Sequence, residues 1–215
     1  MSEYEFEPIR GLPEPLPAGE RILWQGAPKW WGLAKRAFHA RKVAVYCILL
    51  LAWHSVTALA DGEGAATAAL ATLGLVPIAL VAIGLPVGLA WLFARSTVYT
   101  ITNRRVVMRF GVAMPMTVNL PFRTIASAAL RVDRKGIGDL PLALTGGDRI
   151  AWLVLWPHVR PWRLRQPEPM LRAIPEATEV AEILTEALTR APTTRTAPVA
   201  APADSRNSGS LASAA

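Results

Sequence analysis

The chain has few of the residues that build disulfide frameworks, metal clusters and catalytic sites. It contains a single cysteine, Cys47, inside an apolar run, and three histidines, which lie far apart at positions 39, 54 and 158. One cysteine excludes a disulfide framework or a cysteine zinc cluster built from this chain alone. The stretches GIGD and TGGD lack the flanking strand, helix and lysine of a phosphate-binding loop. We therefore expect a protein that is not an enzyme and that holds no metal and no cofactor.

Charged residues are also scarce: they make up 18% of the 215 residues, whereas 52% are hydrophobic and the mean hydropathy is +0.29. A soluble domain of this length is ordinarily more polar, so part of the chain is expected to lie in lipid. Residues 1–17 are acidic and rich in proline, a composition that predicts a flexible segment. This segment lacks the basic and apolar regions of a cleaved signal peptide. Membrane insertion must therefore use internal segments.

Two long uncharged runs predict a transmembrane hairpin over residues 43–94. The first, from Val43 to Ala60, has 18 residues, close to the roughly 20 that cross about 30 Å of hydrocarbon. The second, from Gly64 to Ala94, has 31 residues, too many for one upright helix and too few for two crossings. We expect one crossing over about 68–93, bent at Pro77 and Pro86. Two helices buried in a soluble core are disfavoured, because so short a chain could hardly cover both.

The distribution of charge predicts the orientation of this hairpin. Acids occupy the turn between the runs, and tryptophans lie at the other ends of both. The flanking basic residues are Lys29, Lys35, Arg36, Arg41 and Lys42 before the first run, and Arg95, Arg104, Arg105, Arg109, Arg123 and Arg131 after the second. Loops rich in Lys and Arg stay in the cytoplasm, so both termini are expected there. The net charge of +7 is then explained by contact with membrane lipids, and no nucleic-acid partner is expected.

The rest of the chain predicts an antiparallel sheet domain over residues 95–190. Residues 97–102 and 105–110 alternate with period two around a turn at Asn103 and Arg104, as half-buried strands of a hairpin do. Further strands are expected within 18–42, which also carries a basic segment, and at 116–122, 125–132, 139–144 and 149–156, with a tight turn at 145–148 and a proline-rich connector at 157–169. A helix over 176–190, with an apolar stripe along one side, is expected to close the sheet, and residues 191–215 are expected to form a disordered tail.

The predicted fold class is thus an α+β membrane protein, with a two-helix hairpin, a cytoplasmic antiparallel sheet and a C-terminal helix. This combination resembles the membrane-anchored bacterial pleckstrin-homology-like (PH-like) domains. The stretches GLPEPLPAGERILWQGAP, VYTITNRRVVMRFG, NLPF, GDLPLAL and LWPHVRPWRLRQPEPMLRAIPEA also resemble the PuhB-type photosynthetic complex assembly proteins of purple bacteria. The resemblance covers about residues 4–188.

The resemblance implies a non-catalytic assembly factor for the photosynthetic reaction centre in the bacterial inner (cytoplasmic or intracytoplasmic) membrane. Its partners would be reaction-centre subunits and membrane lipids, and a homodimer stays open. Two other functions also stay open: a membrane carrier that binds lipid or bacteriochlorophyll, and a scaffold unrelated to photosynthesis.

Three groups of residues are candidates for a site. His54 lies in the first span, about 9 Å of helix rise from its outer end, and could ligate the magnesium of a bacteriochlorophyll, although a hydrogen bond to the neighbouring helix explains it more simply. Gly84 and Gly88 form a GxxxG motif around Pro86, which we expect to pack against the first span rather than a partner's helix. Trp162, Arg160, Arg163 and Arg165 are candidates for a docking surface, whereas Trp152 and Trp156 are expected to be core residues of a strand.

Overall fold

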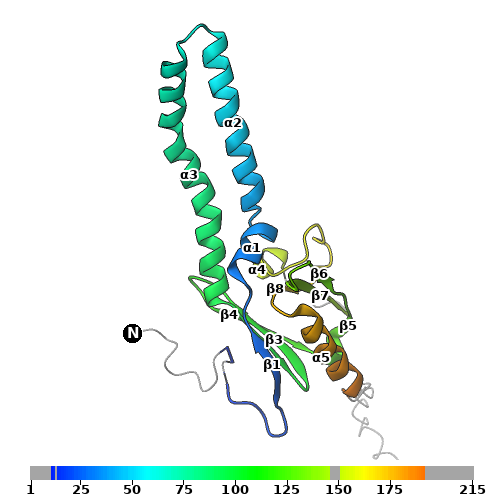
Figure 1. The fold of residues 1–215 in the computed structure, drawn as a ribbon. Coiled ribbons are helices and arrows are strands. Elements are labelled where there is room, and N and C mark those ends of the chain that lie inside the picture. The colour runs from blue at the N-terminus through cyan, green and yellow to red at the C-terminus, as the bar shows by residue number, and fades with distance from the viewer. Residues whose placement is uncertain (1–10, 13, 146–150, 192–215) are drawn as a thin grey trace, which may run out of the picture.

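The structure is a computed structural model that describes residues 11–12, 14–145 and 151–191. Its described part consists of a two-helix hairpin that stands out from one end of a sheet domain (Figure 1). The predicted fold class is confirmed in its elements: two long apolar helices, antiparallel sheets and a C-terminal helix. Most of the flexible segment predicted over 1–17, nearly all of the turn at 145–148 and the tail after residue 191 lie outside the described residues.

The hairpin comprises α2 (Ala40–Ala60) and α3 (Ala65–Ser96), both long and apolar enough to cross a membrane. α3 is one helix of 32 residues that contains Pro77 and Pro86. The second uncharged run therefore forms a single helix, as its length indicates. Few residues of the hairpin are buried. In the most apolar 18-residue segment of each helix, 11% of α2 and 6% of α3 is buried.

The first sheet has the order β1-β2-β3-β4, with all neighbours antiparallel. Its strands are β1 (Ile22–Gly26), β2 (Val98–Thr102), β3 (Arg105–Phe110) and β4 (Met116–Pro121). The strand expected within 18–42 is thus β1, which pairs with β2 on the side away from β3. β2 is buried on both faces, so the prediction of a half-buried strand is wrong for it. The N-terminal segment covers the second face: Gln25 donates to Thr100 and Thr102 donates to Glu20, at 2.9 and 2.8 Å.

The second sheet is built around β7, which pairs antiparallel with three other strands. Its strands are β5 (Ile125–Ala128), β6 (Arg131–Val132), β7 (Gly138–Leu144) and β8 (Met170–Ile174), and a 3-10 turn, η2 (Phe122–Thr124), precedes them. The strand predicted over 149–156 is wrong in its described part, where α4 (Trp152–Leu155) forms one helical turn. A short apolar run does not distinguish strand from helix. The wholly buried β8, which the sequence analysis missed, takes the place beside β7.

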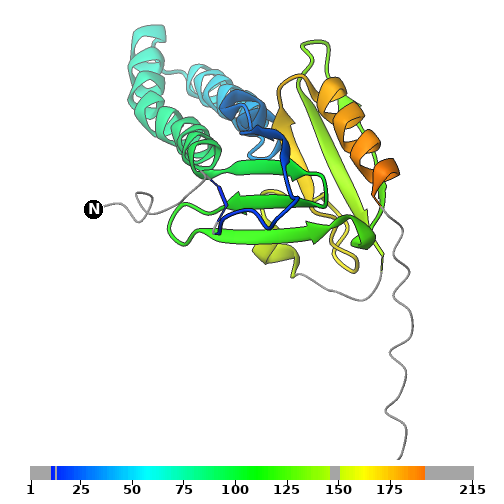
Figure 2. The same ribbon diagram turned by 90° about the horizontal axis from the view of Figure 1, so that it is seen from below.

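The two sheets face each other at an angle around one core, which α5 (Ala177–Arg190) helps to close (Figure 2). Val180, Leu184 and Ala187 of α5 enter this core, as the predicted apolar stripe requires. Tyr99, Ile101 and Met108 from the first sheet are fully buried there, as are Leu140, Leu142, Leu171 and Ile174 from the second. The core thus holds α5 against both sheets.

A short helix that the sequence analysis missed, α1 (Trp30–Arg36), joins the hairpin to the sheet domain. Leu33 and Ala34 pack against small residues of α3, Ala90 and Ala94. On its other side Gly32 lies so close to β8 that a Cβ atom there would be 2.8 Å from the Ala173 Cβ. The Lys29 N–H also donates to the Ala173 carbonyl, at 2.8 Å. α1 is therefore wedged between the membrane-type helix α3 and the second sheet.

Candidate functional site

A buried chain of hydrogen bonds connects the end of α3 to both sheets. Thr97, directly after α3, donates its hydroxyl proton to the Phe93 carbonyl at 2.6 Å. His158 lies between Thr97 and Tyr99, with its Nε2 atom 3.1 Å from Thr97 Oγ1 and its Nδ1 atom 2.6 Å from the Tyr99 hydroxyl. The Arg172 N–H of β8 donates to the same hydroxyl at 3.2 Å. These contacts form what we call the His158 network.

The donors and acceptors of the His158 network determine the tautomer of the imidazole. The single Thr97 proton is committed to the Phe93 carbonyl, so Nε2 of His158 must carry the ring proton and donate it. Nδ1 is then an acceptor, and the Tyr99 hydroxyl donates to it while accepting from Arg172. A neutral imidazole therefore satisfies the Thr97 and Tyr99 hydroxyls and both of its own ring nitrogens.

Burial keeps this network in its neutral form. His158 is wholly inaccessible, and desolvation, with the Arg172 guanidinium nearby, lowers its pKa to about 3. Burial also raises the pKa of the Tyr99 hydroxyl well above its usual range. Neither group changes its charge near neutral pH, so the same set of hydrogen bonds connects α3 to both sheets throughout that range.

Beside the network, a cluster of charged side chains connects α1 to the second sheet. Arg36 lies 2.9 Å from Asp139 and 3.0 Å from Asp133, and it donates to the Ile137 carbonyl at 2.9 Å. Asp139 also accepts from the Ala173 N–H at 2.8 Å. Hydrogen bonds from the Lys135 and Ile137 N–H groups, together with Arg36, lower the pKa of Asp133. Arg36, counted in the sequence as a topology signal, is thus occupied within the sheet domain.

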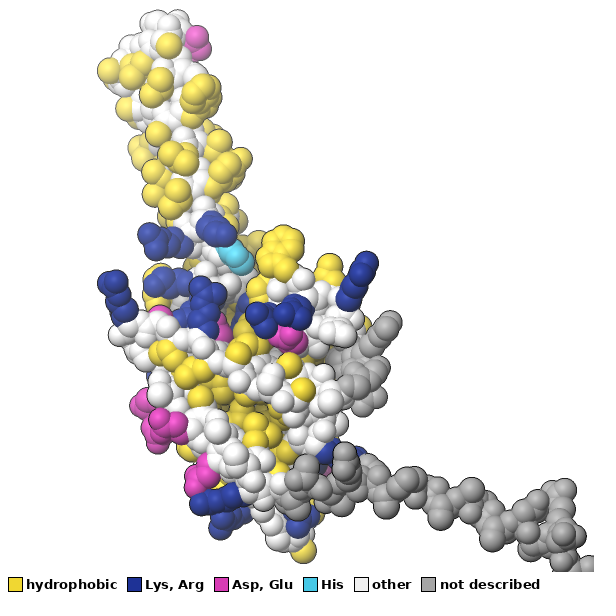
Figure 3. All heavy atoms as spheres, turned by 90° about the vertical axis from the view of Figure 1, so that its right-hand side faces the viewer, with side chains coloured by type: hydrophobic (Ala, Val, Ile, Leu, Met, Phe, Trp, Pro, Cys, Tyr) yellow, Lys and Arg dark blue, Asp and Glu magenta, His cyan; other side chains and the backbone are white. Residues whose placement is uncertain are grey.

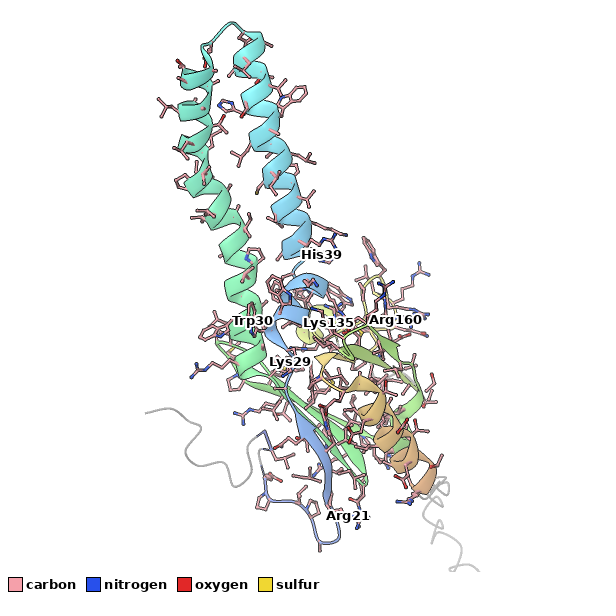
Figure 4. All side chains as sticks on the ribbon, in the orientation of Figure 1. Arg21, Lys29, Trp30, His39, Lys135 and Arg160 are labelled. Atoms are coloured by element: carbon pink, nitrogen blue, oxygen red, sulfur yellow. The ribbon has the colours of Figure 1, made fainter. Side chains whose placement is uncertain are left out.

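Exposed aromatic and basic side chains surround the base of the hairpin. Figure 3 shows Lys and Arg gathered where the helices meet the sheet domain. We call this the hairpin-base surface, made of Trp30, Trp31, Lys35, Arg41, Lys42, Trp91 and Arg95, all exposed. Two cations lie over rings of this surface, Lys35 over Trp31 at 5.9 Å and Arg95 over Trp91 at 5.6 Å. In Figure 4, Lys29, Trp30, His39, Lys135 and Arg160 lie at the hairpin end of the sheet domain, and Arg21 lies at the opposite end.

The predicted docking residues lie on the connector between α4 and β8. Trp162 is 94% exposed, and Arg163 and Arg165 are exposed as well. Arg160 instead pairs with the buried Glu168 at 2.8 Å. Trp156 is 39% exposed and contacts the rings of Phe38 and Phe93 at the hairpin base, so it is not a core residue of a strand. Trp152 does pack against the core, from α4.

The structure does not bring the two candidate sites in the hairpin together with the His158 network. His54 is partly exposed, and its imidazole has no hydrogen bond to any described residue, so the expected bond to the neighbouring helix is not formed. Gly84 and Gly88 are exposed, and a Cβ atom at either would meet nothing within 4 Å. The expectation that they pack against the first span is therefore wrong. α2 and α3 instead contact through the hydroxyls of Ser55 and Thr72, 2.9 Å apart.

Two shallow grooves mark the described surface. One, of about 570 Å³, lies between the β5–β6 segment and α5 and is lined by Ala128, Ala129, Leu130, Thr178, Ala181, Glu182, Thr185, Glu186 and Thr189. The other, of about 460 Å³, lies on the first turns of α2 and is lined by Arg41, Lys42, Val45, Tyr46 and Leu49. Among residues 11–12, 14–145 and 151–191, no three His, Cys, Asp or Glu side chains are grouped to hold a metal ion.

Sequence reasoning missed the His158 network because its members come from three distant segments. Thr97 and Tyr99 have the spacing of a strand, His158 belongs to a proline-rich connector, and Arg172 lies between apolar residues. The one available signal was Arg172 in the stretch MLRAI, where a basic residue inside an apolar strand demands buried partners.

Comparison with known proteins agrees with this architecture. The family model described as "Bacterial PH domain" matches residues 65–188, from the first residue of α3 to the last turn of α5. A protein of Rhodobacter capsulatus described as "Uncharacterized 23.7 kDa protein in puhA 5'region" is 43% identical over 188 residues, which cover 86% of this chain and 87% of that protein. No solved structure matches the chain. Because this model matches more than half of the chain, including every strand except β1, the chain belongs to the bacterial PH domain family.

Proposed function

We propose that this chain is a non-catalytic, membrane-anchored assembly factor for the bacterial photosynthetic reaction centre. In this proposal the PH-like domain and the hairpin act through protein–protein contacts with reaction-centre subunits. The observation that carries the proposal is a bacterial PH domain packed and hydrogen-bonded against the base of a hairpin whose apolar side chains are exposed. The similarity to a protein named for the puhA 5' region, with the resemblance to PuhB-type proteins, supports the photosynthetic target.

The proposed arrangement has α2 and α3 crossing the inner membrane, with both termini and the sheet domain in the cytoplasm. The apolar side chains of the hairpin point outward along its length, as a lipid environment requires. The hairpin-base surface carries basic and aromatic side chains, the composition of a cytoplasmic membrane interface. At the other end, the turn carries Asp61 and Glu63 and no basic residue.

Deletion of the gene in its own photosynthetic host, with complementation in trans, tests this function. We expect a large loss of reaction-centre absorbance in the membranes, restored by the wild-type chain, while reaction-centre transcripts stay unchanged. Crosslinking in native membranes, followed by mass spectrometry, should recover reaction-centre subunits with the tagged chain. A deletion strain with normal reaction-centre levels would contradict the proposal.

A second candidate function is a membrane carrier for lipid or bacteriochlorophyll. Two observations favour it: the groove on α2, basic at Arg41 and Lys42 and apolar along Val45 and Leu49, and the unbonded imidazole of His54. Absorbance of the chain purified in mild detergent separates the two functions. An assembly factor should be colourless, whereas a pigment carrier should show bacteriochlorophyll bands that the His54→Ala variant loses.

A further inference from the structure

We infer that the tip of the connector between α4 and β8 is a third membrane contact, which inserts into an anionic lipid interface beside the hairpin. The tip comprises residues 161–167. This inference rests on the proposed function in one respect: the hairpin must lie in a bilayer. It assigns to lipid a surface that the sequence suggested for a protein partner.

The connector is closed at its base and holds its tip out as one unit. The Arg160 N–H donates to the Glu168 carbonyl, and the Met170 N–H donates to the His158 carbonyl, each at 2.9 Å. The Glu168 carboxylate adds ion pairs with Arg160 at 2.8 Å and Arg163 at 3.4 Å. The two arms are therefore paired by backbone and side chains, and the tip does not depend on a partner for its shape.

The side chains on this unit are those that a lipid interface takes up. Trp162 is 94% exposed and Leu164 is 65% exposed. Trp162 makes no ring contact with any described residue. Tryptophan prefers the headgroup level of a bilayer, where its ring is half in an apolar environment. An apolar tip this exposed would otherwise stand in water.

The charge of the connector fits an anionic surface. Between residues 151 and 169 it contains three arginines, Arg160, Arg163 and Arg165, and one acid, Glu168. Glu168 is buried between Arg160 and Arg163, whereas Arg165 is exposed without an ion-pair partner among the described residues. The outer part of the tip is therefore positive, and basic residues at a bilayer surface are attracted by its anionic lipids.

The position of the connector favours lipid over a protein partner. Trp156, at its start, is seated on Phe38 and Phe93 at the base of the hairpin, with ring centroids 5.3 and 5.7 Å away. Figure 1 shows the connector rising to about the level at which α2 begins, and Figure 3 shows hydrophobic and basic side chains side by side at that level. With the hairpin in a bilayer, a tip at the level of the first turn of α2 lies at the depth of the headgroups.

Depth-dependent quenching in bilayers tests the inference. The full chain, with Cys47→Ala, carries a single fluorescent label on Trp162→Cys, on Leu80→Cys in the middle of α3, or on Arg21→Cys at the far end of the sheet domain. Each is reconstituted into nanodiscs of anionic and neutral lipids that contain shallow or deep spin-labelled lipids. We expect shallow quenching at 162, deep quenching at 80 and none at 21. In anionic discs, replacing both Arg163→Gln and Arg165→Gln should lower the equilibrium constant for insertion of the tip into the interface, by about fivefold per arginine. Shallow quenching at 162 should fall accordingly.

The outcomes separate the inference from the proposed function. Quenching at 80 without quenching at 162 would overturn the lipid contact and leave the membrane anchor intact. No quenching at 80 would overturn the anchor as well. A label at 162 that lipid leaves unquenched, but that native membranes protect from an aqueous quencher, would show a protein partner at the tip and likewise overturn the inference. Leu164→Cys provides a second labelling position within the tip.

Discussion

The apolar side chains of the sheet domain are buried, whereas those of the hairpin are exposed. In the sheet domain Tyr99, Ile101 and Met108 are fully buried, whereas in the hairpin Leu70, Ile78 and Val81 are 68% to 70% exposed. The two helices meet at one pair of hydroxyls, and the side chains buried in the hairpin are small: Ala40, Cys47, Ala58, Ala68, Ala90 and Ala94. The sheet domain therefore buries its own apolar side chains, whereas those of the hairpin need an apolar environment that the described chain does not provide. α1 and the His158 network lie at the boundary and hold the two regions together.

The sharpest way to break this comparison is a charge on each region. Ile78→Arg puts a cation in the middle of α3, which costs about 3 kcal/mol in a bilayer, and we expect the chain to be lost from alkali-washed membranes. Val132→Arg, on the partly exposed edge strand β6, should leave the chain in the membrane fraction. Equal recovery of both variants would mean that lipid does not surround the hairpin.

The next effect tests the boundary. Tyr99→Phe removes the hydroxyl on which His158 Nδ1 and the Arg172 N–H both depend, leaving two buried groups unpaired. We expect a loss of about 3 kcal/mol in the free energy of unfolding, measured by urea titration of the full chain in detergent. Tyr46→Phe, on the exposed surface of α2, is the matched control and should change nothing. An unchanged midpoint for Tyr99→Phe would contradict the network.

The pH dependence of stability tests whether His158, at the boundary between the two regions, is held neutral by burial. The pKa of His158 is about 3 in the fold and about 6.5 in the unfolded chain, so the unfolded state binds the extra proton between these values. The contribution of the neutral imidazole to the free energy of unfolding is fully present above pH 6.5. It is lost as the pH falls from 6.5 toward 3, by up to about 1.4 kcal/mol per pH unit.

Urea midpoints of the full chain at pH 7, 6 and 5 measure this slope above the range in which Asp133 titrates. His158→Gln, which cannot be protonated, should flatten it. A wild-type chain without the slope, or a variant that keeps it, would show that the imidazole is not held neutral by burial.

The smallest effect lies inside the hairpin. Ser55→Ala removes the one hydroxyl contact between α2 and α3 in the described residues, which is worth about 0.6 kcal/mol in a membrane. We expect a small increase in the mean distance between labels on the two helices, measured by electron spin resonance. We expect no change in the sheet domain. A loss as large as that of Tyr99→Phe would mean that the hairpin depends on its internal contacts after all.

Local patterns in the sequence predicted the elements whose burial is set within one segment. The uncharged runs predicted α2 and α3, period-two alternation predicted the β2–β3 hairpin, and the amphipathic stripe predicted α5. They failed for α1, α4 and β8, since each is short and is stabilised by distant neighbours. The GxxxG motif of Gly84 and Gly88 likewise said only that close approach is allowed, and α2 does not make it.

The sequence by itself thus determined how many long helices there are, where charge lies around them and which strands alternate, because these depend on the nearest residues along the chain. Only the tertiary structure decided which polar groups meet. Thr97, Tyr99, His158 and Arg172 come together because each needs a hydrogen-bond partner once it is buried, and the nearest partners lie on other segments. The same folding leaves Trp162 without a partner in the described chain and places its connector beside the hairpin.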